Sequence, residues 1–338
     1  MKKLISLICV LAMVLALAAC GSSAPAAATE APAASTEAPD EDVSADKTFA
    51  VGICQLVQHP ALDAATQGFK DAPTEALGDK VTFQEQNASG DSATCSLICN
   101  QFVSDEVDLI MANATASIQA AASATNTIPI LGTSITDYGV ALGVDNWTGV
   151  SGTNISGTSD LAPLDGQAAM IQELFPDAKT IGLLYCSGEP NSIFQADSME
   201  ALLTDMGYSV ERYTFADSND VSSVTANACS NADVLYIPTD NTAASCTEAI
   251  NNVALSAGIP IVAGEEGLAS GCGVATLSIS YYDLGRATGE MAAEILTEGA
   301  DVSTMEVRFA PAFTKEYNAD ICEALNITVP EDYIAIAK

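Results

Sequence analysis

From residue 48 onward, short apolar segments alternate with longer segments that have a helical period. The apolar segments favour strands buried on both faces, because they run continuously instead of alternating with polar residues. Strands and helices that alternate this regularly predict parallel sheets covered by helices on both faces. We expect strands at 48–54, 81–86, 107–112, 128–132, 180–186, 208–215, 233–238, 259–264 and 273–279, and helices at 61–77, 92–104, 116–125, 163–174, 192–206, 220–228, 242–257 and 282–297.

Residues 139–162 interrupt this alternation. They are rich in Gly, Thr, Ser and Asn and have no helical period, and the alternation resumes at residue 163. A break of this composition between two α/β halves is typical of an interdomain crossover. A folded part of about 290 residues is also long for one hydrophobic core. The sequence therefore predicts a two-lobed α/β protein.

The first 46 residues differ from the rest. Residues 1–19 have a basic start and an apolar run, which is typical of a secretory signal peptide. The sequence LAAC followed by GSS resembles the lipobox of bacterial lipoproteins, which implies lipidation of Cys20; a plain signal with a chance cysteine is the alternative. The composition of residues 20–46, mostly Ala, Pro, Ser, Thr, Asp and Glu, predicts a disordered linker. We expect an extracytoplasmic protein anchored to the cell membrane by lipid, with no later membrane span.

Charge and cysteine usage exclude several classes of partner. There are 44 acidic and 11 basic residues, a net charge of −33, whereas nucleic acid and anionic membrane surfaces attract basic patches. The ten cysteines and one histidine form no CxxC pair and no usual zinc spacing, so we expect no metal. Apart from Cys20, we interpret the cysteines as core residues, although an exported protein can also form a disulfide.

Ligands of open α/β sheets bind beyond the carboxyl ends of the strands, so two facing sheets predict a cleft between two lobes. The loops after the predicted strands are rich in Ser, Thr, Asn, Asp and Glu, and for any one of these residues helix capping is the commoner role. The loops are Gln55–Pro60, Asn87–Asp91, Asn113–Ser117, Thr133–Tyr138, Ser187–Ser192, Ala216–Asn219, Thr239–Thr242 and Glu265–Gly267. None of them contains Lys or Arg.

This lack of basic residues constrains the ligand. A ligand carboxylate would have to bind hydroxyl groups and the free N–H groups of helix N-termini. A polyanion is disfavoured because no arginine is available to bind it. A ligand amine would find the carboxylates of four residues, Asp137, Glu189, Asp240 and Glu265. The loops therefore favour a neutral or zwitterionic small molecule.

The sequence offers no catalytic constellation. His59 is the only histidine, and no G-x-S-x-G segment accompanies it. We find no metal cluster and no phosphate-binding loop, so we expect neither an enzyme nor a cofactor. Pro60 suits the first position of a helix, and we interpret His59 as a hydrogen-bonding or shape-setting residue of the cleft.

Eight segments occur in order and at the spacing of one family. They are VGICQLVQHPALDAATQGFKDA, MANATASIQAAA, IPILGTSITDY, TGVSGTNISGTSD, LLYCSGEPNSIFQ, YIPTDNTAAS, IPIVAGEEG and ISYYDLGRATGEMAAEIL. Together they resemble the substrate-binding lipoproteins of ABC transporters of the tryptophan-transporter type (TrpX-like), and QHPALD, GEPNS and PTDN are the most specific blocks. The resemblance extends from Thr48 to about Lys338 and implies the type I periplasmic-binding-protein fold. Pro73, inside the first predicted helix, departs from the family pattern.

The resemblance also implies boundaries, a ligand and partners. The first lobe would comprise 47–155 plus 280–300, and the second 156–279 plus 301–338. The ligand would be an amino acid, most simply an aromatic one, and the partner an ABC permease; we expect a monomer. The candidate ligand-binding residues are Gln58, His59, Thr115, Ser117, Thr136 and Asp137 in the first lobe, and Glu189, Asn191, Ser192, Asp240, Asn241 and Glu265 in the second.

Several alternatives stay open. Tyr138 or Tyr185 would stack on an apolar ligand side chain or pack in a core. The ligand would otherwise be a branched-chain or other neutral amino acid, or a neutral sugar. A sugar site usually has a flat aromatic platform, and the only tryptophan, Trp147, lies in the predicted crossover. A ligand sensor that docks on a membrane receptor would have the same binding chemistry.

Overall fold

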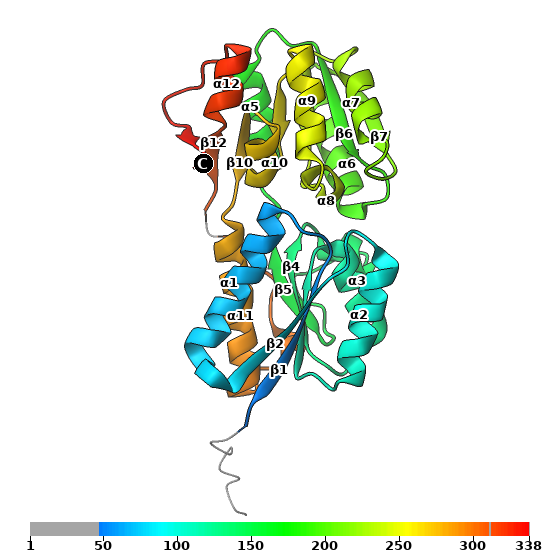
Figure 1. Cartoon of the computed structure of the whole chain (residues 1–338), viewed down its shortest axis with the longest axis vertical. Coiled ribbons are helices and arrows are strands. Elements are labelled where there is room, and N and C mark those ends of the chain that lie inside the picture. Colours follow the sequence, from blue (N-terminus) through cyan, green and yellow to red (C-terminus); the bar gives the residue numbers. More distant parts are fainter. Residues whose placement is uncertain (1–46, 311, 338) are drawn as a thin grey trace, which may run out of the picture. The chain divides into compact units, whose positions relative to one another are not determined.

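The computed structural model describes residues 47–310 and 312–337. These residues contain two sheets, each with helices on both faces (Figure 1). The predicted signal peptide 1–19, the lipidated Cys20 and the linker 20–46 lie outside the described residues. Within the described part of the chain, no helix is long and apolar enough to cross a membrane.

The first sheet has six strands in the order β11-β5-β4-β3-β1-β2, and all its neighbours pair in parallel. Together with its helices it forms the first lobe. Its strands are β1 (Phe49–Gln55), β2 (Val81–Asn87), β3 (Leu109–Asn113), β4 (Ile130–Ile135), β5 (Ile155–Ser159) and β11 (Arg308–Phe309). Its helices are α1 (Pro60–Leu77), α2 (Ser92–Ser104), α3 (Thr115–Ala124), α4 (Tyr138–Leu142) and α11 (Tyr281–Glu298), with 3-10 turns at Gly78–Lys80 and Val302–Thr304.

The second sheet has seven strands in the order β13-β12-β10-β9-β8-β6-β7, and only the β10–β12 pair is antiparallel. Together with its helices it forms the second lobe. Its strands are β6 (Thr180–Cys186), β7 (Ser209–Phe215), β8 (Val234–Ile237), β9 (Ile261–Ala263), β10 (Ala275–Ser278), β12 (Thr314–Tyr317) and β13 (Ile334–Ala335). Its helices are α5 (Leu164–Leu174), α6 (Pro190–Asp205), α7 (Val221–Cys229), α8 (Asn241–Ala244), α9 (Thr247–Ala257), α10 (Glu266–Gly271) and α12 (Ala319–Leu325).

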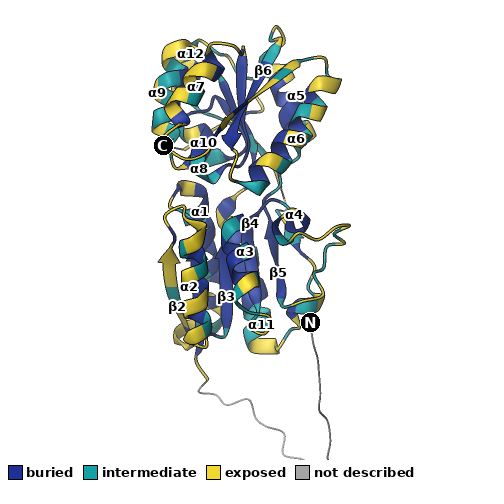
Figure 2. Ribbon diagram, turned by 90° about the vertical axis from the view of Figure 1, so that its right-hand side faces the viewer, coloured by how far each residue is buried: buried dark blue, intermediate teal, exposed yellow. Residues whose placement is uncertain are grey.

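Both faces of the central strands are buried, as the apolar runs predicted. In the first lobe, Val51 and Ile53 of β1 pack in one cluster with Phe69 of α1 and Met291 of α11. Cys54 of the same strand packs in another cluster with residues of α2 and α3. Successive residues of a strand point to opposite faces, so one strand serves two cores. The inner strands of both sheets are accordingly buried along most of their length, whereas edge strands such as β2 and β7 and the outer sides of the helices are exposed (Figure 2).

All nine predicted strands are present, but residues 139–162 contain two elements that we did not predict, α4 and β5. The helix expected at 242–257 is two helices, α8 and α9. The strand pairings also correct the limits proposed for the lobes. β5, at 155–159, pairs with β4, and β11 pairs with β5, so both strands belong to the first sheet. The division into lobes at the remaining limits stays a prediction.

Helices α1 and α11 lie side by side although more than 200 residues separate them in the sequence (Figure 1). Glycines make this close packing possible. A methyl group on Gly285 would lie 2.0 Å from the carbonyl oxygen of Ala65, and one on Gly68 would lie 2.1 Å from that of Tyr282. The crossing of α1 and α11 is therefore possible only with small residues at positions 68 and 285.

Pro73 is buried inside α1, which continues to Leu77, so it does not end the helix.

Replacement of Gly285 by alanine is expected to lower the free energy of unfolding by about 1–3 kcal/mol, because the two helices must move apart. Alanine is the better helix former, so the contact has to overcome that preference. Thermal and denaturant unfolding measure the effect. Gly188→Ala is the matched control, since its methyl group would make only ordinary contacts at 3.7 Å. Equal stability of the two variants would contradict the packing argument.

Candidate functional site

The carboxyl ends of the strands of both sheets meet at one cavity. It is small, about 10 Å³, which corresponds to roughly one water molecule. Both lobes contribute to its wall, and two hydrogen bonds join the lobes beside it. The wall consists of His59, Leu62, Ser134, Thr136, Asp160, Asn191, Thr239, Asp240, Asn241, Ala244, Glu265 and Tyr281.

A chain of three side chains fixes the protonation of His59. Asn241 donates from Nδ2 to the carboxylate of Glu189 at 2.7 Å, which turns its Oδ1 toward His59. His59 Nε2 lies 3.3 Å from that oxygen and must therefore carry the proton. Burial lowers the pKa of His59, so the ring is neutral and Nδ1 is an acceptor. Nδ1 is buried and has no partner.

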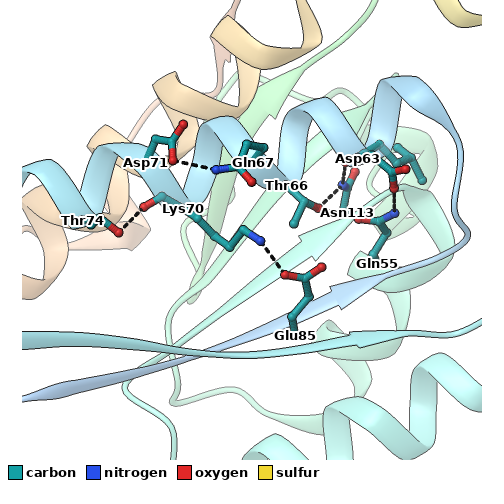
Figure 3. A network of polar contacts seen from close by, with 10 residues as sticks. Gln55, Asp63, Thr66, Gln67, Lys70, Asp71, Thr74, Glu85 and Asn113 are labelled. Atoms are coloured by element: carbon teal, nitrogen blue, oxygen red, sulfur yellow. Dashed lines mark hydrogen bonds and ion pairs between the residues drawn. The ribbon is translucent and has the colours of Figure 1, made fainter. Parts of the chain in front are cut away.

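A buried polar network holds the loop that carries His59. Gln55, the last residue of β1, donates to Asp63 of α1 at 2.6 Å and accepts from Thr66 at 2.6 Å. Asn113, the last residue of β3, donates to Thr66 at 3.0 Å (Figure 3). These bonds tie the ends of two strands to the first turns of α1. The first lobe thus positions the loop that carries His59.

Ser134 has a backbone conformation that serine rarely adopts. Its φ of +55° lies in the left-handed region, and it occupies the irregularity between β4 and β5. Such a residue costs about 1–2 kcal/mol and is typically retained where function requires it. Its hydroxyl is buried in the wall of the cavity and has no hydrogen-bond partner. Ser134 therefore provides a free donor there.

Asp160 follows β5 directly, at the first passage of the chain between the lobes. Its side chain is buried, and burial raises its pKa. Tyr281, which starts α11 at the second passage, donates its hydroxyl to Oδ2 of Asp160 at 2.9 Å. Oδ1 of Asp160 has no partner. One carboxylate oxygen is thus held in place and the other is free.

Asp240 and Glu265 are two further buried carboxyl groups of the cavity wall, and each begins a short helix. Asp240 accepts hydrogen bonds from the backbone N–H groups of Cys186 and Ala243 at 2.6 and 2.8 Å. Glu265 accepts from those of Gly267 and Leu268 at 2.6 and 2.5 Å. Burial raises the pKa of Asp240, helped by nearby Glu189, and raises that of Glu265 to about 7. Helix capping therefore already occupies both groups.

The structure brings half of the residues predicted to bind a ligand to the cavity. Six line it: His59, Thr136, Asn191, Asp240, Asn241 and Glu265. The others lie outside it: Gln58, Thr115, Ser117, Asp137, Glu189 and Ser192. Whether any of them contacts a ligand stays a prediction.

The residues outside the cavity have recognisable structural roles. Asp137 caps α4 by accepting from the N–H of Val140 at 2.7 Å. Ser117 is fully buried, and its hydroxyl lies 3.6 Å from the sulfur atoms of Cys54 and Cys95. Glu189 accepts hydrogen bonds from both the backbone and the side chains at the start of α8, and Gln58 is exposed. Helix capping and core packing thus account for most of the predicted residues that lie outside the cavity.

Six residues of the wall were not predicted, and they divide into three kinds. Ser134 and Thr239 belong to the predicted cleft loops but were not singled out. Asp160 and Tyr281 lie where the chain passes between the lobes. A strand at 155–159 would have placed Asp160 at a carboxyl end by the same rule. Leu62 and Ala244, both apolar, carried no signal in the sequence.

The aromatic and sulfur groups belong to the cores. Tyr138 is buried, donates to the carbonyl of Gly132 at 3.0 Å and stacks on Trp147 at 5.7 Å. Tyr185 packs in the core of the second lobe. The core interpretation of both tyrosines is therefore the one that the structure supports. Among the described residues all eight cysteines are free, and no cluster of His, Cys, Asp and Glu could hold a metal ion.

The wall of the cavity has a distinct chemistry. It contains three buried carboxyl groups and, among the described residues, no Lys or Arg. Three polar atoms of the wall have no partner: Nδ1 of His59, Oγ of Ser134 and Oδ1 of Asp160. Buried polar groups are nearly always hydrogen-bonded in folded proteins. The chemistry of this wall therefore suits a small polar molecule that carries a positive charge and hydrogen-bonding groups.

Comparison with known proteins gives consistent relationships. A family model described as ABC transporter substrate binding protein matches residues 50–338. A tyrosine-binding protein from Clostridioides difficile is 38% identical over 280 residues, which cover 82% of this chain and 81% of that protein. The match thus spans nearly all of the folded part.

Two solved structures resemble this one over most of its length. An ABC domain in complex with L-Trp from Streptococcus pneumonia is 31% identical, with a TM-score of 0.80 over 84% of this chain and 97% of that one. A ligand-free, open structure of a substrate binding protein with adhesive properties from Clostridium difficile is 37% identical, with a TM-score of 0.66 over 86% of this chain and 100% of that one. The chain thus superposes better on the L-Trp complex, although its sequence is closer to the open protein.

The raised pKa of Glu265 predicts a pH effect on stability. Between its ordinary value of 4.5 and about 7, the folded protein keeps the proton that the unfolded chain loses. The free energy of unfolding should therefore fall as the pH rises through this range, by up to about 3 kcal/mol from this group. Urea unfolding at pH 5 and pH 8 would show that the wild type loses more stability than Glu265→Gln. A pH-independent difference between the two proteins would disprove the effect.

Proposed function

Because the chain belongs to the ABC transporter substrate-binding protein family, we propose that it captures an aromatic amino acid in the cavity between its lobes. Proteins of this family bind a small molecule outside the cytoplasm and work with an ABC permease. They are binding proteins, and this one needs no catalytic step for that role. The finer points concern the ligand, how it is bound, and how the protein is anchored.

The observation that carries the proposal is the buried carboxylate oxygen of Asp160 that has no hydrogen-bond partner. This oxygen, Oδ1, is a buried acceptor next to two other carboxyl groups, with no basic residue in the wall. Burial of a carboxylate is costly unless a positive group pairs with it. The ammonium group of an amino acid supplies that charge. We therefore place the ammonium at Asp160, which Tyr281 holds in position from the other side.

The remaining groups of the wall suit the rest of a zwitterion. Ser134 has an unpaired hydroxyl, and those of Thr136 and Thr239 lie 3.4 Å apart on opposite lobes, a weak contact that each can exchange for a ligand oxygen. These hydroxyls are the donors for the ligand carboxylate. Nδ1 of His59 accepts a second hydrogen from the ammonium. A neutral sugar would leave the carboxyl groups without a positive partner.

Two of the similar proteins support an aromatic side chain. One is named for tyrosine, and another was crystallised with L-Trp. Ligand pockets usually have volumes of roughly 300–1,000 Å³, far above the 10 Å³ of the cavity. Binding therefore requires the lobes to separate and to close again about the ligand, with the chain passages between the lobes as hinges. Three passages follow β5, β10 and β11.

We also propose that the lipid on Cys20 anchors the protein outside the cytoplasm, and that it acts as a monomer. The signal-like residues 1–19 and the LAAC segment support the anchor. The linker at 20–46 would allow the lobes to reach a permease in the same membrane. Labelling of the cells with a radioactive fatty acid, with Cys20→Ala as control, tests the anchor.

A thermal-shift screen of the mature protein tests the ligand class. Tyrosine, tryptophan and phenylalanine at about a hundred times their dissociation constants should each stabilise it by roughly 2.7 kcal/mol. Leucine and neutral sugars serve as comparators and should give smaller shifts. A shift with a sugar alone would exclude the amino acid proposal.

Asp160→Asn is expected to weaken binding of the amino acid by at least tenfold, because a hydrogen bond to a charged group contributes roughly 1.5–3 kcal/mol. Isothermal titration calorimetry measures the affinity, and circular dichroism confirms that the variant folds. The matched control is Asp91→Asn, since Asp91 caps α2 outside the cavity. If Asp160→Asn retained the wild-type affinity, the ammonium would have to bind elsewhere.

A further inference from the structure

A second cavity lies beside the first, on the side of α1 and α10. Its volume is about 330 Å³. Pro60, Ala61 and Ala64 of α1 form one wall, and Gly267 at the start of α10 belongs to the opposite one. Tyr281 and Tyr282, at the start of α11, contribute aromatic surface. Both lobes thus build this hinge-side cavity, whose wall combines these apolar and aromatic groups with Glu265, Glu266, Ser270 and Ser280.

The hinge-side cavity adjoins the site of the ammonium group. Glu265 and Tyr281 belong to the walls of both cavities. Tyr281 is also the residue that donates its hydroxyl to Asp160. A ligand whose ammonium group contacts Asp160 therefore has its Cα next to Tyr281. When the lobes close about the ligand, its side chain can extend past Tyr281 into the hinge-side cavity.

A third cavity, of about 370 Å³, lies at the front of the cleft and fits a ring less well. It shares only Asn241 with the first cavity, the small one that Asp160 lines. The contact of Asn241 with His59 separates the two cavities. Its wall contains three carboxylates, Asp91, Glu189 and Asp217. An aromatic ring loses little by leaving water only where the wall is apolar. The front cavity has three carboxylates and no aromatic side chain in its wall, whereas the hinge-side cavity has two carboxylates and two tyrosines, so the front cavity is the poorer choice.

We infer that the hinge-side cavity receives the aromatic ring of the bound amino acid, packed between Ala64 of α1 and Gly267 of α10. This inference rests on the proposed function. A cavity of roughly 150 Å³ already holds benzene, so 330 Å³ admits a phenol or an indole ring. A methyl group on Gly267 would lie 3.4 Å from Pro60 of the other lobe. The ring thus fills a space that both lobes enclose.

The walls also define the class of side chain. Glu265 and Glu266 belong to the cavity, so an acidic side chain is excluded by like charge. A hydroxyl or N–H group on the ring finds carboxylate acceptors there, which favours tyrosine and tryptophan over phenylalanine. A short aliphatic side chain would leave most of the volume empty and would lose contacts with the walls. The cavity therefore selects a ring that carries a hydrogen-bond donor.

Ala64→Phe tests the inference by filling the hinge-side cavity without changing any polar group. Ala116→Phe is the matched control, because Ala116 is also a half-buried helical alanine but lines the front cavity. Calorimetry with tyrosine and tryptophan should show at least a tenfold loss of affinity for Ala64→Phe. Ala116→Phe should stay within twofold of the wild type. Ala64→Leu, a smaller plug, should give an intermediate loss.

The outcomes separate the two proposals. If the wild type binds tyrosine and Ala64→Phe binds it equally well, or if only Ala116→Phe loses affinity, the ring lies elsewhere while the proposed function stands. If the wild type binds no amino acid, the proposed function itself fails. A crystal structure of the wild type with tyrosine decides the matter even where a variant does not fold. Its ring should contact Ala64, and a ring against Ala116 would overturn the inference.

Discussion

Three carboxyl groups are buried between the lobes with no basic residue beside them, and this arrangement determines most of what the site can do. Asp240 and Glu265 tolerate burial because backbone N–H groups bind both of their oxygens, from helix starts and, for Asp240, also from Cys186 at the end of β6. Asp160 accepts from the hydroxyl of Tyr281 at Oδ2, and its buried Oδ1 has no hydrogen-bond partner. The cavity is therefore electrostatically incomplete at one atom, which the ligand ammonium that we propose would complete. The preference for a positive group that we propose follows from this one difference in hydrogen bonding.

The fold was predictable because its signal is carried by many residues at once. Strands such as β1 and β3 are apolar up to their last residue, and a buried parallel sheet requires that pattern. β5 escaped prediction for a physical reason. A methyl group on its Gly157 would lie 2.0 Å from the carbonyl of Gly132, so the strand has to be built of small residues. Its sequence, ISGTS, therefore has the small, polar composition that is typical of a loop.

The site was predictable only in part, because cleft residues and helix caps have the same chemistry. Asp137 and Asp240 both begin helices after strands, and only Asp240 reaches the cavity. Nothing local in the sequence distinguishes them, since the difference lies in how two lobes face each other. Asp160 was missed because the strand before it was missed. Errors in the fold therefore propagate to the site wherever a ligand-binding residue follows an atypical strand.

The contacts between the lobes are weak, and this weakness is compatible with capture and release of a ligand. His59 and Asn241 are 3.3 Å apart and Thr136 and Thr239 are 3.4 Å apart, both beyond the best hydrogen-bond lengths. Each such bond contributes about 1 kcal/mol or less. A ligand shifts the equilibrium between open and closed lobes only by its differential affinity for the closed form. Since these two hydrogen bonds supply little closing energy, the ionic contact that we propose at Asp160 and the burial of the ligand side chain would supply the rest.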